Sequence, residues 1–183
     1  MFDFEMAPIA FWLFGRSAAG KTTLSQVLSG EIRRSGRPVV ELDGDQIRAG
    51  LSQDLGFSAE DRTENHRRLA ELARLISDQS TVVVVSSMAP LALHRKLAGD
   101  ILGERVRWVH VDATLETCIR RDPKRLYHRA RTGSVSQLLE FPFEAPNPDE
   151  PVLHLVTDLD SVEETARRLV DWAGPQIDSA ARR

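Results

Sequence analysis

The residues with the most specific chemistry lie at positions 15–23, which fit the pattern G-x-x-x-x-G-K-[ST]. In that pattern, glycine-rich backbone turns its N–H groups toward phosphate oxygens at the start of a helix. Lys21 then reaches the β- and γ-phosphates, and the hydroxyl of Thr22 holds Mg²⁺. A glycine-rich turn that merely precedes a helix is the weaker interpretation, because an apolar run at residues 9–14 predicts a strand directly before it. The expected nucleotide-binding loop, called the phosphate loop below, comprises Gly15, Arg16, Ser17, Ala18, Ala19, Gly20, Lys21, Thr22 and Thr23.

A second group of chemically useful residues follows the next apolar run. Asp43 and Asp45 come after residues 39–42, and Arg48 lies one short turn further on. Open α/β sheets keep their ligand crevice at the carboxyl ends of the strands, so these carboxylates are placed to act on a bound phosphate. For Asp45, a role as metal anchor and a role as structural cap stay equally open.

Basic side chains gather in two places. Arg62, Asn65, Arg67 and Arg68 lie in the first turns of a helix that the capping sequence beginning at Ser58 predicts, where cations oppose the helix dipole. They indicate either an anionic partner or a solvated basic face balanced by Asp61 and Glu64, and charge pattern alone favours the solvated face. Residues 120–141 are rich in cations at their start, broken by Pro123, and predicted to form a lid over a polyphosphate. The alternatives there are an ordinary exposed stretch and a nucleic-acid patch.

The elements that must position these residues alternate between strand and helix. Residues 81–85 are β-branched and apolar throughout, which is typical of a central strand covered on both faces of a parallel sheet. We expect a doubly wound α/β sheet with irregular chain at 132–151. The last helix should end at Gly174-Pro175 and leave residues 175–183 frayed. The predicted strands are 9–14, 39–42, 81–85, 107–111 and 152–156, and the predicted helices are 21–34, 58–76, 91–102, 114–121 and 161–174.

Composition limits the classes of function. The 183 residues fit one domain, and a net charge of −3 gives no general attraction to nucleic acid or to an anionic membrane. The single Cys118 forbids an internal disulfide and suits a reducing cytoplasm. The five histidines show no metal-ligand spacing, the first residues form a strand instead of a signal peptide, and no later run is long enough to span a membrane.

Taken together, these residues resemble the adenylylsulfate (APS) kinase family over positions 11 to about 158. The most specific segments are the phosphate loop and residues 42–48, 54–68 and 121–124, with 126–127 and 130–131. The resemblance implies a P-loop NTPase-type sheet, mainly parallel, with helices on both faces. It also implies a cytoplasmic homodimer that uses ATP and Mg²⁺ to phosphorylate the 3′-hydroxyl of APS, making PAPS and ADP.

Residue roles follow from the same resemblance. It implies that Lys21, Asp43 and Asp45 are catalytic, that Thr22 and Asp43 hold the metal, and that Arg121 joins the phosphate loop in binding ATP. It assigns the acceptor nucleotide to a set that comprises Asp43, Arg48, Phe57, Arg62, Asn65 and Met88. Arginines suit the bidentate contacts that a sulfate–phosphate anhydride offers, and Phe57 offers a face for adenine.

Two departures from the family pattern keep other functions open. Ala89 stands where the family usually has a serine, so a phosphorylated serine intermediate is impossible here, although direct transfer needs none. Residues 135–141 carry Ser136 and Leu138 in place of a lysine and a second stacking aromatic. One alternative is therefore a kinase for another 5′-modified nucleotide, such as cytidine diphosphoramidate, or for an acceptor of specialised metabolism. A second is a non-catalytic nucleotide-binding regulatory subunit, and a distant one is a nucleic-acid 5′-kinase.

Overall fold

A five-stranded parallel sheet forms the centre of the chain, and its strand order is β2-β3-β1-β4-β5. The computed structural model describes residues 7–131 and 142–181. Every residue of the middle strand β1 is buried, because side chains on both of its faces are covered by helices. The strands are β1 (Ala10–Phe14), β2 (Val39–Asp43), β3 (Val82–Ser87), β4 (Val106–Asp112) and β5 (Val152–Val156).

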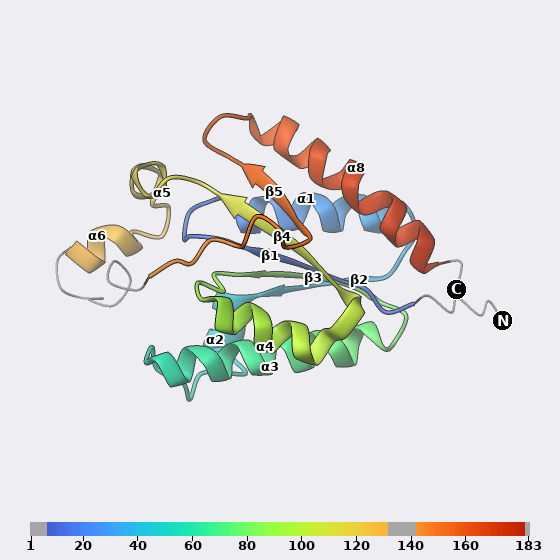
Figure 1. Cartoon of the computed structure of the whole chain (residues 1–183), viewed down its shortest axis with the longest axis horizontal. Helices are drawn as coiled ribbons and strands as arrows, with labels where there is room; N and C mark the ends of the chain where they lie inside the picture. Colours follow the sequence, from blue (N-terminus) through green and yellow to red (C-terminus); the bar gives the residue numbers. More distant parts are fainter. Residues whose placement is uncertain (1–6, 132–141, 182–183) are drawn as a thin grey trace.

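Helices cover both faces of this sheet, as Figure 1 shows. On one face, α1 (Lys21–Arg34) and α8 (Val162–Ala180) pack against alternate residues of β1, such as Phe11 and Leu13. On the other face, α3 (Ala59–Ser77) and α4 (Ala92–Leu102) pack against the intervening residues, including Trp12 and Phe14. The doubly wound α/β fold expected from the sequence is thus confirmed, and all described strand pairs are parallel.

The short elements sit at the carboxyl ends of the strands. They are α2 (Gly44–Ala49), α5 (Leu115–Arg121) and α6 (Leu126–Arg131), while the single turn η1 (Gly103–Arg105) leads into β4. Residues 142–151 contain no helix or strand, as expected. Residues 132–141, including the altered positions Ser136 and Leu138, lie outside the described residues, as do 1–6 and 182–183.

The predicted helix starts are confirmed by their caps. Ser58 begins α3, and its hydroxyl accepts a hydrogen bond from the Asp61 amide at 3.1 Å. Ser161 begins α8 with a full capping box, in which the Glu164 carboxylate accepts a hydrogen bond from the Ser161 amide at 3.1 Å. Each cap satisfies N–H groups that the first turn of a helix leaves without partners.

The predicted end of the last helix is wrong. The helix does not stop at Gly174 but continues through Ala180 with Pro175 inside it. Its buried stripe runs on through Ile177 and Ala180, and the Ala180 carbonyl accepts a 2.7 Å hydrogen bond from the amide of Ala7. Burial of Ile177 and Ala180 and this backbone hydrogen bond compensate for the hydrogen bond that proline cannot donate. Residues 175–181 are therefore not a frayed tail.

Strand β3 also differs from its predicted limits. It begins at Val82 and extends through Ser87, two residues into the predicted loop, because Ser86 and Ser87 pair with Leu13 and Phe14 of β1. Within the described part of the chain, every helix is too short or too polar to cross a membrane.

Candidate active site

Gly15 and Gly20 of the phosphate loop adopt backbone conformations that other residues rarely adopt. Gly15 has a φ of +152°, and a Cβ added there would lie 2.1 Å from the carbonyl oxygen of Val111. Gly20 has a φ of +106° and is the N-cap of α1 without any side-chain cap. The first amides of α1 are therefore open to an anion, as a phosphate site requires.

Lys21 folds back over the phosphate loop. Its Nζ donates hydrogen bonds to the carbonyl oxygens of Gly15 at 3.0 Å and Arg16 at 2.7 Å. Burial lowers the pKa of Lys21 to about 8, although the carboxylates of Asp45 and Asp43 act in the opposite direction. A bound polyphosphate offers this ammonium group stronger partners than two neutral carbonyls.

Asp43 connects the phosphate loop to the second strand. It is the N-cap of α2, and its Oδ1 accepts from the amides of Asp45 at 2.9 Å and Gln46 at 3.4 Å. Its Oδ2 accepts from the hydroxyls of Thr22 at 3.1 Å and Ser86 at 3.0 Å. Burial alone would raise the pKa of Asp43, but these hydrogen bonds outweigh it and hold the pKa below its usual value. Asp43 stays ionised at neutral pH.

Asp45 is not the structural cap, since Asp43 fills that role. Its carboxylate instead pairs with Nζ of Lys124, which lies in the turn between α5 and α6. That hydrogen bond is the main reason that the pKa of Lys124 is raised. The start of the predicted lid therefore reaches across to the carboxylates that follow β2.

Thr157 and Tyr127 hold carbonyl groups of the phosphate loop by hydrogen bonds, and Arg121 in turn binds Thr157. Arg121 donates to the hydroxyl of Thr157 at 3.0 Å and to its carbonyl at 2.6 Å, and the Thr157 hydroxyl donates to the Ala19 carbonyl at 2.9 Å. The hydroxyl of Tyr127 donates to the Ser17 carbonyl at 3.1 Å. Sequence reasoning missed Thr157 and Ser86, whose only signal is their position at the end of a strand.

Arg48, Phe57 and Arg62 form a separate cationic platform. The guanidinium carbons of Arg48 and Arg62 lie 4.9 Å and 5.6 Å from the centroid of the Phe57 ring. Arg48 also donates to the Gly56 carbonyl at 2.8 Å, and Arg62 to the Phe57 carbonyl at 3.0 Å. The ring remains 54% exposed, so it can still receive a planar group. The arrangement suits a ligand that combines an aromatic base with an anion.

The neighbouring cations of α3 behave differently. Arg67 pairs with Glu64 through two bonds of 2.7 Å and 2.9 Å, and Arg68 pairs with both Glu64 and Asp54. These two arginines form the balanced, solvated face that the charge pattern favoured, whereas Arg62 is buried. Asn65 is also buried, and its Oδ1 has no hydrogen-bond partner among the described residues.

Comparison with known proteins places this geometry in a family. Residues 7–155 match the family model described as adenylylsulphate kinase. The chain belongs to the adenylylsulphate kinase family. The adenylyl-sulfate kinase of Paraburkholderia xenovorans (strain LB400) is 42% identical over 161 residues, covering 87% of this chain and 89% of that protein.

Other relatives of this adenylylsulphate kinase family member differ in length. The bifunctional enzyme NodQ of Rhizobium sp. (strain N33) is 41% identical over 90% of this chain, but the chain spans only 26% of NodQ. Among solved structures, the APS kinase CysC of Mycobacterium tuberculosis in complex with AMPPNP and APS has a TM-score of 0.85 and 36% identity. That match covers 91% of this chain and 97% of that one.

One departure of this adenylylsulphate kinase family member from the usual pattern, Ala89, lies within the described residues. Ala89 is fully buried with a φ of +38°, and its carbonyl accepts from Arg95 at 3.3 Å. Its neighbour Met88 accepts through its carbonyl a 3.2 Å hydrogen bond from the Gly15 amide. The segment after β3 thus supports the phosphate loop through backbone contacts, which do not require a serine.

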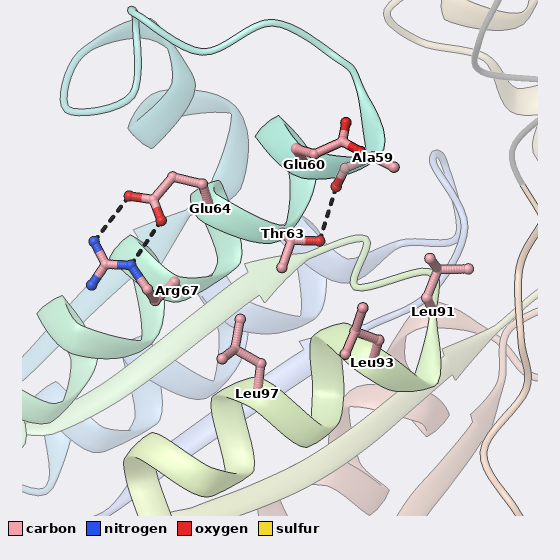
Figure 2. A pocket seen from close by; sticks show the side chains of 8 residues that line it. All are labelled: Ala59, Glu60, Thr63, Glu64, Arg67, Leu91, Leu93 and Leu97. Carbon is pink, nitrogen blue, oxygen red and sulfur yellow. Dashed lines mark hydrogen bonds and ion pairs between the residues drawn. The ribbon is translucent and has the colours of Figure 1, made fainter.

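A groove with a volume of about 520 Å³ opens between the first turns of α3 and α4, as Figure 2 shows. None of the residues that the sequence assigns to the active site lines it. In the same view, Arg67 turns toward Glu64 and away from Leu93 and Leu97. The groove is therefore separate from the phosphate loop and its carboxylates. It is lined by Ala59, Glu60, Thr63, Glu64, Arg67, Leu91, Leu93 and Leu97.

Proposed function

We propose that this chain transfers the γ-phosphoryl group of ATP to the 3′-hydroxyl of adenylylsulfate, giving PAPS and ADP. The observation that carries the proposal is the 3.1 Å hydrogen bond between Thr22 and Asp43. It brings the phosphate loop and an ionised carboxylate to the same point, and helix α2 leads from that carboxylate to Arg48 of the platform. Relatives named adenylyl-sulfate kinase and the complex of CysC with AMPPNP and APS support the same reaction.

In this proposal, some side chains bind the phosphoryl donor ATP and others bind the acceptor nucleotide. Lys21 neutralises charge on the β- and γ-phosphates, and Arg121 orders the loop that binds them. Asp43 orients the 3′-hydroxyl and accepts its proton. A carboxylate with a lowered pKa is a weak base, which suffices because the proton leaves late in a loose phosphoryl-transfer transition state. Arg48, Phe57, Arg62, Asn65 and the segment at Met88 hold the acceptor.

Mg²⁺ fits the residues at this point. The Thr22 hydroxyl and the Asp43 carboxylate supply the hard oxygen ligands that Mg²⁺ prefers, and Asp45 lies close by. When bound with ATP, the ion would neutralise negative charge on the phosphates. We further propose that the protein works in the cytoplasm as a homodimer, on small nucleotides and without nucleic acid or membrane. These expectations rest on the family resemblance and on composition.

The direct test is an ADP-release assay with Mg-ATP and APS beside a panel of other 5′-modified nucleotides that includes cytidine diphosphoramidate. NMR assigns the position of the new phosphate. We expect turnover of APS at micromolar concentrations to a 3′-phosphorylated product. Activity confined to another nucleotide would support the phosphoryl-transfer chemistry but contradict adenylylsulfate as the acceptor. ATP binding without any turnover would favour the regulatory subunit.

Lys21→Ala should lower kcat by about 10²- to 10³-fold, because the cation on the transferred phosphoryl group is lost. Its fold should survive, since the ammonium group of Lys21 donates its hydrogen bonds to carbonyls of the phosphate loop itself. Near-wild-type kcat in a variant with an unchanged circular dichroism spectrum would remove Lys21 from the mechanism.

Arg62→Ala should raise the KM for the acceptor about tenfold or more and leave the KM for ATP almost unchanged. Arg67→Ala is the matched control, because Arg67 lies on the same helix but pairs outward with Glu64. We expect that control to change either KM by less than about twofold. Equal rises in both KM values for Arg62→Ala would place Arg62 on the ATP side.

A further inference from the structure

Strands β4 and β5 bring together three potential metal ligands that are distant in the sequence. His110 and His154 are direct register neighbours in the parallel pair, and Asp112 follows His110 by two residues on the same face. One ligand atom from each residue lies within 4.8 Å of the other two. The cluster is on the face of the sheet that carries Trp12 and Phe14, at the carboxyl ends of the strands.

His110 is the unusual member of this group. The residue is only 3% exposed, and neither ring nitrogen has a hydrogen-bond partner within residues 7–131 and 142–181. The ring is fixed by stacking, with centroids 5.0 Å from Phe14 and 5.6 Å from Phe143. A buried imidazole that is held in place without a partner calls for a ligand, because burying an unpaired polar group is costly.

The carboxylate of Asp112 lies where it can join the two imidazoles. Its Oδ2 is 3.1 Å from Nε2 of His154, and its Oδ1 is 4.0 Å from Nε2 of His110. The two rings are parallel within 4°, with centroids 4.9 Å apart, so a shared ion requires one ring to turn. His154 is the ring that turns, since its side chain is 54% exposed whereas His110 is packed.

We propose that His110, Asp112 and His154 bind a borderline divalent transition-metal ion such as Zn²⁺. Two imidazole nitrogens and one carboxylate oxygen are ligands typical of Zn²⁺, and a fourth position stays open for water. The site differs in kind from the oxygen ligands at Thr22 and Asp43, which suit Mg²⁺. It does not depend on which nucleotide accepts the phosphate.

Two arginines limit the affinity of the site. Arg16 lies 5.0 Å from the ring of Phe143, and Arg95 lies 4.9 Å from the ring of Phe14, and both of these rings stack on His110. The two guanidinium groups repel a cation, so we expect a Kd of about 1–10 µM instead of the nanomolar values of closed structural sites.

Binding of the ion would affect the phosphate loop through backbone hydrogen bonds. The Asp112 carbonyl accepts a 2.9 Å hydrogen bond from the Thr157 amide, and the hydroxyl of Thr157 donates to Ala19. An ion that ties β4 to β5 at Asp112 therefore fixes the residue that orders Arg121 against the phosphate loop.

The test is isothermal titration of the full chain with Zn²⁺ after treatment with EDTA. Visible absorption of bound Co²⁺ provides a second readout that needs no enzyme activity. We expect one equivalent of Zn²⁺ to bind. His154→Ala and Asp112→Asn should each weaken binding at least tenfold, and both positions are exposed enough for the variants to fold. His128→Gln is the control, because His128 is an exposed histidine elsewhere in the chain.

Loss of affinity in both variants with an unchanged control would support the site. Absence of Zn²⁺ binding by the wild-type chain would overturn it. So would full affinity in either variant, or a loss of the same size in His128→Gln.

Discussion

Gly15 stands where the phosphate loop passes closest to strand β4. An alanine methyl group at that point would overlap the carbonyl oxygen of Val111 at 2.1 Å, and this oxygen belongs to backbone that the sheet holds rigidly. Gly36 offers a contrast, because its φ of +79° also favours glycine but no atom lies within 4 Å of an added Cβ. The two glycines separate the effect of a close approach from the effect of backbone conformation.

Gly15→Ala should lower the free energy of unfolding by about 3 kcal/mol or more, since the overlap with backbone cannot relax cheaply. Gly36→Ala should cost about 1 kcal/mol, the usual penalty of a left-handed conformation for alanine. Urea denaturation of both variants measures the difference. Equal losses would mean that the loop moves away from β4 without cost.

At the scale of elements, α5, α6 and the end of β5 act together on the phosphate loop. Tyr127 of α6 and Thr157 after β5 hold the carbonyls of Ser17 and Ala19, while Lys124 pairs with Asp45 across the site. Residues 124–127, at the start of the predicted lid, therefore contact both the phosphate loop and Asp45.

Tyr127→Phe should lower the free energy of unfolding by about 1 kcal/mol, because the Ser17 carbonyl loses its partner. We also expect the KM for ATP to rise several-fold while the KM for the acceptor stays the same. Steady-state kinetics with each substrate varied in turn provides the measurement. A rise in the acceptor KM alone would show that α6 serves the other substrate.

The sequence predicted these elements well where a local pattern specifies them. The apolar run of β3, the glycines of the phosphate loop and the cap at Ser161 each act within a few residues. It failed where distant segments meet. His110 and His154 are 44 positions apart, so no spacing rule can reveal that they are neighbours in register. The predicted helix end at Gly174-Pro175 was wrong for the opposite reason. There, burial of the residues beyond Pro175 overrides a local stop signal.

At the scale of the whole molecule, α3 and α4 are joined by a buried histidine pair. The rings of His66 and His94 stack with centroids 4.4 Å apart and planes within 7°. Burial, with a smaller effect from the charge on the other histidine, lowers the pKa of His66 to about 3. Burial and the nearby guanidinium groups of Arg62 and Arg95 lower the pKa of His94 to about 4. Both rings are neutral at pH 7.

This pair should make the fold sensitive to mild acid. Because each folded pKa lies below the unfolded value near 6.5, the unfolded chain takes up protons that the folded chain does not. Stability is fully present above pH 6.5 and falls as the pH drops toward 4. We expect a loss of about 2–3 kcal/mol between pH 7 and pH 5.5 from the two rings.

His66→Leu should remove about half of that loss, as measured by denaturant unfolding at the two pH values. His128→Gln, at an exposed position, should leave the dependence unchanged. A wild-type protein equally stable at both values would show that the rings take up protons freely in the folded state.

The hydrogen bond between Ala7 and Ala180 has a consequence for how the domain can be joined to others. Both residues lie at the amino edge of the sheet, opposite the carboxyl edge where the phosphate loop begins. The described chain therefore begins and ends at neighbouring points, on the side of the sheet opposite the phosphate loop. Domains whose two ends lie close together tolerate fusion and insertion, which agrees with the match of this chain to about a quarter of the longer NodQ enzymes.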